Sequence, residues 1–329
     1  MLGTSHRALT HFRRYLPDTV SRWLLFHDGR FTSTVAEKLA LIIPTLAVVD
    51  LRHTTAEHIE HLDRAYFPVA DVGALFLSIF DATRQHDDTY LSAYRRLNVF
   101  DTWPSNRCRI VDETTDRTFD ALFDVDPEEL RAECLATLRQ FRSGGHASFR
   151  SADSHLAISY AALSGTAYTG FEAYEFNLPS GEVAFKPTYV KGHVSLRGWI
   201  IGSIPFGQKH GHIERGELQL SFDAGRITAV RGSRTALVDD LTAALEQSPG
   251  LREVNEFGIG LHRAAAALAR RHTVGLQWME KCRGLHLGLG AELGEHIEDH
   301  RLRRTHHHLD LVFEDGELSV VGGTQLTWP

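Results

Sequence analysis

The sequence segment THHHLDLVF (305–313) combines imidazole and carboxylate side chains with a strand-like apolar pattern. Side chains alternate along a strand, so His306, His308 and Asp310 are expected on one face, and His307 and Leu309 on the other. An imidazole and a carboxylate on one rigid strand can bind the same transition-metal cation. A polar sheet edge without a metal would give the same pattern, so this segment alone leaves both interpretations open.

Three further polar side chains lie in apolar or glycine-rich segments. They are Glu182 in NLPSGEVAFKP (177–187), Glu256 in VNEFGIGLH and His286 in MEKCRGLHLGLG. An ionised carboxylate buried without a partner costs several kcal/mol, so something must compensate it. A salt bridge to Arg or Lys would explain either glutamate separately. One shared cation explains Glu182, Glu256, His286, His308 and Asp310 together, and the sequence favours it.

Glu280 and Lys281 come shortly before His286. Two interpretations remain open for this pair. The two residues either orient a metal ligand through hydrogen bonds or form a simple ion pair on the surface.

Residues 1–150 predict an α/β domain that precedes these candidate ligands. Short apolar runs near residues 23–27, 46–50, 74–80 and 108–112 alternate with helical patterns, which indicates a parallel sheet with flanking helices. The clearest helix is DPEELRAECLATLRQFRSGG, in which Asp126 is placed to cap, and Gly144 and Gly145 end the helix. A domain boundary is predicted just after this helix.

Residues 151–329 predict an α+β domain with a largely antiparallel sheet. Apolar and polar residues alternate on both sides of Ala224-Gly225 and of Asp315-Gly316, which predicts two hairpins. The segments VDDLTAALEQ and LHRAAAALARRH predict two helices. The candidate ligands all fall in this C-terminal domain.

The composition excludes several classes of partner. The 329 residues include 35 Lys and Arg against 42 Asp and Glu, which argues against nucleic acid or an anionic membrane as the main partner. No apolar run is long enough to span a bilayer, and three widely spaced cysteines give no disulfide framework. A soluble cytoplasmic protein that acts on a small molecule or peptide is expected.

The ordered motifs LPSGEV, NEFGIG, EKCRGLHLGLG and HLD resemble those of the thermophilic-type metallo-aminopeptidases, the aminopeptidase T and aminopeptidase S group. The resemblance covers about the second half of the chain. It implies an α/β domain followed by a metal-binding catalytic domain, a homodimer, and two divalent cations such as Zn, Co or Mn. Carried over motif by motif, Glu182, Glu256, His286, His308 and Asp310 would be the ligands.

The resemblance implies hydrolysis of an amide or peptide-like bond in a small substrate by metal-activated water. Glu182 or Glu256 would carry the proton from the water to the leaving amine. The chain departs from the family at Leu293, where the family has a tyrosine that steadies the tetrahedral intermediate. It departs again at His155, near where an acidic residue is expected.

The same group includes 2,5-dihydroxypyridine dioxygenase, which implies an alternative function. That ring-cleaving enzyme uses one iron(II) held by two histidines and an aspartate, for which His286, His308 and Asp310 would serve here. In this alternative, the substrate would be bound by histidines elsewhere in the chain: His155, His193, His210 or His212.

That dioxygenase has a histidine in place of Glu256 and has no counterpart of Glu182, so the two glutamates favour hydrolysis. A third possibility is a non-catalytic metal protein that binds peptides, which the missing tyrosine at Leu293 would support. Metal analysis distinguishes the three: two ions for the hydrolase, one oxygen-sensitive iron for the dioxygenase, and none for the third.

Overall fold

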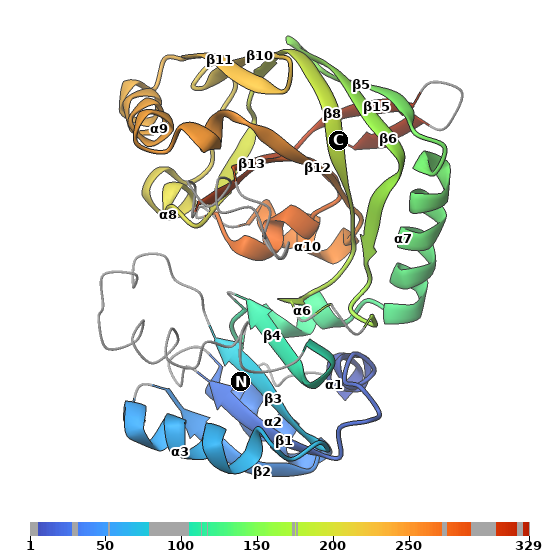
Figure 1. Cartoon of the computed structure of the whole chain (residues 1–329), viewed down its shortest axis with the longest axis vertical. Helices are drawn as coiled ribbons and strands as arrows, with labels where there is room; N and C mark the ends of the chain where they lie inside the picture. The colour runs from blue at the N-terminus through green and yellow to red at the C-terminus, as the bar shows by residue number, and fades with distance from the viewer. Residues whose placement is uncertain are drawn as a thin grey trace. The chain divides into compact units, whose positions relative to one another are not determined.

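The computed structural model describes most of the chain (Figure 1). The described residues are 6–27, 32–51, 53–78, 105–112, 114–116, 118–172, 175, 177–271, 275–290, 307–320 and 325–328. They form two compact units, residues 1–131 with 168–181, and residues 132–167 with 182–329.

The first unit contains a five-stranded parallel sheet with the order β2-β1-β3-β4-β7. Its strands are β1 (Arg22–His27), β2 (Thr45–Asp50), β3 (Val72–Ser78), β4 (Cys108–Asp112) and β7 (Asn177–Leu178). Its helices are α1 (His6–Arg13), α2 (Ser33–Ile42), α3 (Ala56–Tyr66), α6 (Phe119–Phe123) and the 3-10 helix η2 (Ser105–Arg107). The predicted parallel sheet with helices is confirmed.

Apolar side chains of this sheet pack against helices. Leu24, Phe26 and Phe76 belong to one buried cluster that also includes Leu62 of α3. The rings of Phe26 and Phe76 stack with their centroids 4.7 Å apart. A continuous apolar run such as that of β1 is what a strand covered on both faces requires.

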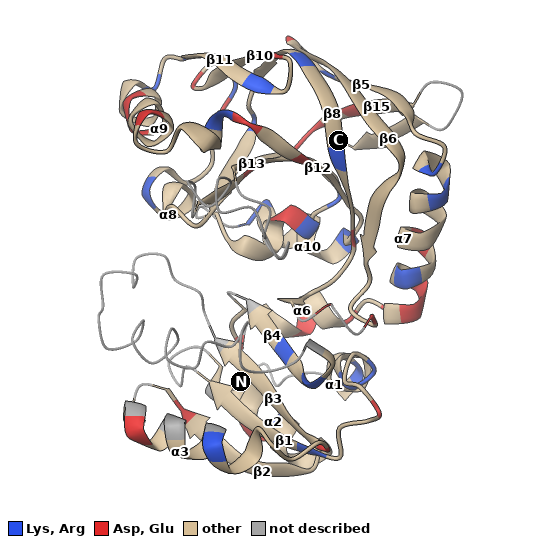
Figure 2. Cartoon of the chain, in the orientation of Figure 1, with Lys and Arg blue, Asp and Glu red and all other residues tan. Residues whose placement is uncertain are grey.

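The helix α7 (Pro127–Phe141) forms where the sequence predicts it. The Asp126 carboxylate accepts the backbone N–H of Glu128 at 2.8 Å, so Asp126 caps the helix as expected. Acidic residues lie at the beginning of α7 and basic residues further along it (Figure 2), which suits the helix dipole. Gly144 follows the helix at a φ of 71°.

The division between the units differs from the boundary predicted after residue 150. The division passes through α7, because residues up to 131 belong to the first unit and residues from 132 belong to the second. The chain also returns to the first unit at residues 168–181, where Asn177 and Leu178 of β7 pair with β4. A strand of two residues is too short to show the alternation of apolar and polar residues from which strands are predicted, so the sequence did not indicate β7.

The second unit is built on an 11-stranded sheet in which neighbouring strands such as β12 and β13, or β13 and β14, pair antiparallel. The order is β16-β15-β5-β6-β8-β12-β13-β14-β9, and β10 joins β8 and β11. The strands are β5 (Gly145–Ser151), β6 (Ser154–Tyr168), β8 (Glu182–Ser195), β9 (Gly198–Gly202), β10 (Gln219–Asp223), β11 (Arg226–Arg231), β12 (Val254–Gly260), β13 (Gly284–Gly290), β14 (His308–Phe313), β15 (Gly316–Val320) and β16 (Gln325–Trp328). The predicted antiparallel sheet is confirmed.

The helices of the second unit include the two predicted ones. They are α8 (Phe206–His210), α9 (Thr235–Gln247), α10 (Arg263–Ala269) and the 3-10 helices η3 (Pro249–Arg252) and η4 (Gln277–Lys281). The end of α7 contributes Phe141, whose ring lies 4.8 Å from that of Phe185. Phe185 stacks in turn on Phe257 at 5.0 Å. This aromatic cluster anchors β8 and β12, the two strands that carry the candidate glutamates.

One predicted hairpin forms and the other does not. β10 and β11 pair around Ala224 and Gly225, both at positive φ. At Asp315 and Gly316, by contrast, the chain leaves β14 and continues as β15, which pairs with β5 and β16. Ser151 Oγ donates a hydrogen bond to Asp315 Oδ1 at 2.9 Å, and Arg215 forms an ion pair with the same carboxylate. Contacts with residues distant in sequence therefore determine the direction of the chain after β14.

No described helix combines the length and the hydropathy that a membrane-spanning segment needs.

Candidate metal site

All five candidate ligands lie on four consecutive strands of the large sheet. Glu182 is on β8, Glu256 on β12, His286 on β13, and His308 and Asp310 on β14. Antiparallel pairing places Gly258 opposite His286, and Gly288 opposite both Glu256 and Asp310. Because cross-strand partners share a face of the sheet, this register directs the ligand side chains into one region.

Two glycines clear the space that these side chains occupy. A Cβ atom at Gly258 would collide with the imidazole of His286. A Cβ atom at Gly288 would lie 2.8 Å from Glu256 Cβ and 2.9 Å from His308 Cε1. The glycines in NEFGIG and HLGLG are therefore spatial requirements of the cluster, a role that the sequence analysis did not assign to them.

His286 lies between the two glutamates. Its Nε2 atom is 2.7 Å from Glu182 Oε1 and 3.2 Å from Glu256 Oε1. Burial alone lowers the pKa of His286, but the charge and hydrogen bond of Glu182 outweigh it, and the pKa is raised well above its usual value. Burial tends to raise the pKa of Glu256, but the hydrogen bond and charge of His286 hold it below its usual value. These three residues can each offer one ligand atom within 4.8 Å of the others.

His308 and Asp310 form the adjacent part of the cluster. His308 Nε2 is 3.0 Å from Asp310 Oδ1, and Asp310 is fully buried. Burial raises the pKa of Asp310, and the charge of His308 opposes that shift only in part. Both residues interact electrostatically with Glu256, which joins them to His286 and Glu182. The structure thus brings the five predicted residues together.

Lys281 is a buried partner of Glu182. Its ammonium group pairs with Glu182 Oε2 and lies 2.6 Å from Glu280 Oε1. Burial alone would lower the pKa of Lys281, but the carboxylates of Glu182 and Glu280 raise it well above its usual value. Lys281 is only 9 % exposed, so the sequence alternative of a surface ion pair is wrong.

The donor set fits a divalent cation. Four carboxylates, those of Glu182, Glu256, Glu280 and Asp310, lie around one ammonium group and two imidazoles. The raised pKa of His286 favours a positive charge that compensates part of this set, and a divalent cation bound to the neutral imidazole would replace that charge. His286 Nδ1 and Asp310 Oδ2 are buried and have no hydrogen-bond partner within the described part of the chain. Imidazole with carboxylate is a donor combination for Zn, Fe or Mn.

The other candidate histidines have different surroundings. His155 and His193 are exposed on β6 and β8. His210 Nε2 lies 2.6 Å from Asp240 Oδ2, and His212 Nε2 lies 3.0 Å from Glu314 Oε2. Leu293 and His306 fall outside the described residues.

Sequence comparisons identify no relatives, because no family model and no curated protein match the chain. A comparison of folds does give a match. A solved structure of a 2,5-dihydroxypyridine dioxygenase from Pseudomonas putida KT2440 superposes with a TM-score of 0.62 at 14% identity. The match covers 98% of this chain and 94% of that one. At such low identity the likeness establishes a shared fold.

The comparison corrects the function predicted from the sequence. The aminopeptidase-type hydrolase finds no support in any family model, whereas the matching fold is that of a 2,5-dihydroxypyridine dioxygenase. The motifs LPSGEV, NEFGIG and HLD lie at the strands β8, β12 and β14, and a fold does not by itself specify a reaction. The chain therefore has a two-domain α/β fold similar to that of a dioxygenase, with a carboxylate–histidine cluster in its antiparallel sheet.

Proposed function

We propose that the chain is a metal-dependent dioxygenase that opens the ring of a small hydroxylated aromatic substrate, with one iron(II) ion held by His286, His308 and Asp310. The observation that carries the proposal is the register of the paired strands β13 and β14, which puts His286, His308 and Asp310 on the same face of the sheet. Such a set is the usual base for oxygen activation by non-haem iron. The fold shared with a 2,5-dihydroxypyridine dioxygenase supports the same reaction class.

The ion pair of Lys281 supports one metal ion rather than two. Lys281 binds Glu182 Oε2, so one oxygen of this carboxylate already pairs with a buried ammonium group. A second cation bridged by Glu182 would have to displace the ammonium group, at the cost of leaving Lys281 buried beside it. Glu182 then serves as the buried counter-charge of Lys281 instead of binding a second ion.

The proposed reaction is balanced without an added reductant. One carbon–carbon bond of the ring breaks, both atoms of dioxygen enter the product, and the ring supplies the electrons that reduce the dioxygen. The iron would supply a coordination position for dioxygen and substrate. Glu256 has 23% of its side chain exposed and is the most accessible of the five. Glu256 lies 3.2 Å from His286 at the accessible side of the cluster and would be placed to accept the proton of a ring hydroxyl.

The proposal also covers the cellular location, the oligomeric state and the partners of the protein. The chain would be a cytoplasmic homodimer that acts on a small molecule, and the net charge of −7 disfavours nucleic acid and anionic membranes as partners. Sedimentation analysis of the purified full chain would measure the oligomeric state.

Metal analysis and oxygen uptake test the proposal together. Protein purified without oxygen should contain one iron per chain and should consume one dioxygen for each molecule of 2,5-dihydroxypyridine or a related dihydroxylated ring that it opens. Two tightly bound zinc ions per chain, with no oxygen uptake after loading with iron, would overturn the proposal.

His308→Ala is the informative variant, and His146→Ala is its matched control. His308 belongs to the cluster, whereas His146 is an exposed histidine on β5 that bonds Ser159 at 2.8 Å. We expect only His308→Ala to lose iron and oxygen uptake. Equal activity of the two variants would contradict the assignment of β14 as a ligand strand.

A further inference from the structure

A second concave site lies in the second unit, outside the metal cluster. It is a cavity of about 220 Å³ formed by α10, the residues before β13, and parts of β9, β14 and β16. None of the five candidate ligands lines it. The cavity is therefore a candidate ligand-binding site separate from the carboxylate–histidine cluster.

The cavity is rich in positive charge. Arg263, Arg270 and Arg283 line it. Arg263 also pairs with Glu133 at 3.3 Å, through side chains that are 69% and 29% exposed, so solvent weakens that pair. Arg270 and Arg283 are exposed, and neither has a carboxylate partner within the described ranges.

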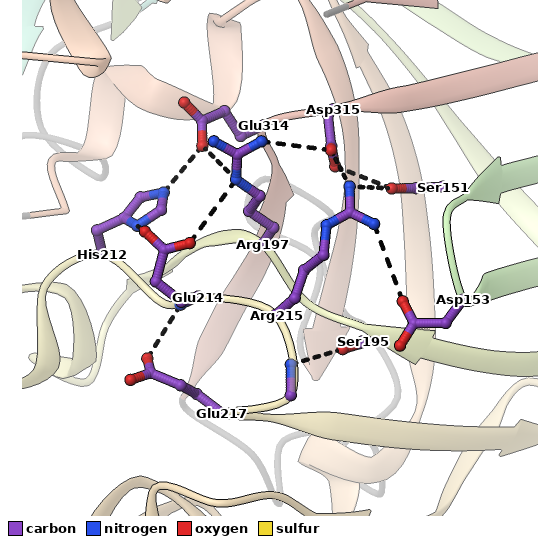
Figure 3. A network of polar contacts seen from close by, with 11 residues as sticks. Ser151, Asp153, Ser195, Arg197, His212, Glu214, Arg215, Glu217, Glu314 and Asp315 are labelled. Carbon is purple, nitrogen blue, oxygen red and sulfur yellow. Dashed lines mark hydrogen bonds and ion pairs between the residues drawn. The ribbon is translucent and has the colours of Figure 1, made fainter.

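Glu314, the acidic residue among those lining the cavity, is already neutralised by other groups (Figure 3). Its carboxylate lies 3.3 Å from Arg197 Nε and 3.0 Å from His212 Nε2. Arg197 also reaches Asp315 at 3.5 Å, so Glu314 is one member of a wider network. The positive charge of Arg270 and Arg283 thus remains available to an anion.

The other walls of the cavity are aromatic and apolar. Trp199, Trp328, Phe313 and Val312 line it. The indole nitrogens of Trp199 and Trp328 are buried and have no hydrogen-bond partner among the residues that the structure describes. A cavity of about 150 Å³ lined by apolar side chains is large enough to hold benzene. The present one therefore has room for a single aromatic ring with one small substituent.

We propose that this cavity binds a small aromatic carboxylate. The ring would pack against the two tryptophans and Phe313, and the carboxylate would face Arg270 and Arg283, since guanidinium groups bind carboxylates through paired hydrogen bonds. An inorganic anion would leave the aromatic walls unused, and a neutral ring would leave the arginines without a partner. The site does not depend on the proposed reaction.

Calorimetric titration of the full chain with benzoate tests this site. The protein is first stripped of metal with a chelator, so that binding of a carboxylate to a metal ion does not contribute. We expect saturable binding of benzoate, weaker binding of benzamide and acetate, and weaker binding of inorganic phosphate. Equal affinity for benzoate and benzamide would overturn the proposal, as would the absence of saturable benzoate binding.

The double variant Arg270→Gln with Arg283→Gln should weaken benzoate binding by tenfold or more, because hydrogen bonds to charged groups are lost. Both residues are exposed, so the fold should persist. Arg271→Gln is the matched control, since Arg271 is an exposed arginine next in sequence that does not line the cavity. Unchanged affinity in the double variant would overturn the assignment.

Trp199→Phe separates the role of the indole from that of the arginines. We expect a smaller loss of affinity with the preference for benzoate over benzamide retained, because the charged groups remain. Loss of that preference in Trp199→Phe, with the arginines intact, would contradict the proposed orientation of the ligand.

Discussion

Lys281 on η4 and Glu182 on β8, 99 residues apart in sequence, form a buried ion pair at the edge of the carboxylate–histidine cluster. The pair fixes one oxygen of Glu182, while His286 takes the other. A salt bridge of this kind is expensive to break because either partner alone would be a buried, uncompensated charge.

Lys281→Met should destabilise the second unit by roughly 3–5 kcal/mol, the usual cost of breaking a buried ion pair. Urea denaturation of metal-free protein measures this change. Lys191→Met is the control, because the Lys191–Asp223 pair has side chains that are 62% and 60% exposed and should contribute roughly 0–1 kcal/mol. Equal denaturation midpoints for the two variants would show that the Lys281 pair contributes little.

Asp310→Asn should weaken metal binding by more than about 100-fold, since even residues that only orient ligands change metal affinity by about 10–100-fold. The substitution keeps the size of the side chain but removes a charge that is fully buried. Competition with a coloured chelator measures the affinity. The parallel variant Asp153→Asn, at an exposed position, should bind metal as the parent does; a similar loss in both variants would point to a general defect.

Gly258→Ala should abolish metal retention, because the added Cβ would displace the imidazole of His286. Elemental analysis after gel filtration reports the metal content. For comparison, Gly225→Asn alters a turn in which an added Cβ would have no other atom within 4 Å. Gly225 has a φ of 75°, which asparagine tolerates. A Gly258→Ala protein with full metal content would place the ligand atoms elsewhere than in this cluster.

The stability of the first unit should depend on pH through Glu175. Burial raises the pKa of Glu175, although the backbone N–H groups of Thr169 and Gly170 favour its ionised form. A carboxyl group whose pKa is raised on folding stabilises the folded state. This contribution to the free energy of unfolding is complete below the pKa in the unfolded chain, about 4.3, and is lost as pH rises through the higher pKa in the folded state.

Urea denaturation of the parent protein and Glu175→Gln at several pH values measures this effect. The stability of the parent relative to Glu175→Gln should fall as pH rises from about 4.3 and should level off above the folded pKa. A constant difference across this range would show that Glu175 ionises with equal ease in the folded and unfolded chains.

Local patterns in the sequence predicted much of the fold, and they singled out polar side chains that the structure places close together on neighbouring strands. The alternation of His308 and Asp310 placed both on one face of β14, and Asp126 marked the beginning of α7. Polar residues within apolar runs identified Glu182 and His286, since burial of such groups requires compensation. These signals all lie within a few residues of the feature that they predict.

The features that the sequence did not predict depend on distant residues. The partner of Glu182 is Lys281, and no spacing rule connects them. The turn at Asp315 and Gly316 resembles a hairpin locally, but contacts with Ser151 and Arg215 redirect the chain. The main prediction for the reaction, hydrolysis, was wrong, and the fold comparison agrees better with the alternative of a dioxygenase, because one scaffold can serve more than one reaction.

Neither unit is a continuous stretch of polypeptide, because β7 completes the first sheet while the strands before and after it in sequence, β6 and β8, belong to the second. A gene fragment that ends after residue 150 would lack this edge strand, and the remaining fragment would have lost the whole of α7. Proteolytic cleavage between residues 167 and 182 would therefore cut the polypeptide without releasing an intact half of the molecule. The two units must be synthesised and inherited together, so recombination that exchanged either one alone would need to carry two separate pieces of the gene.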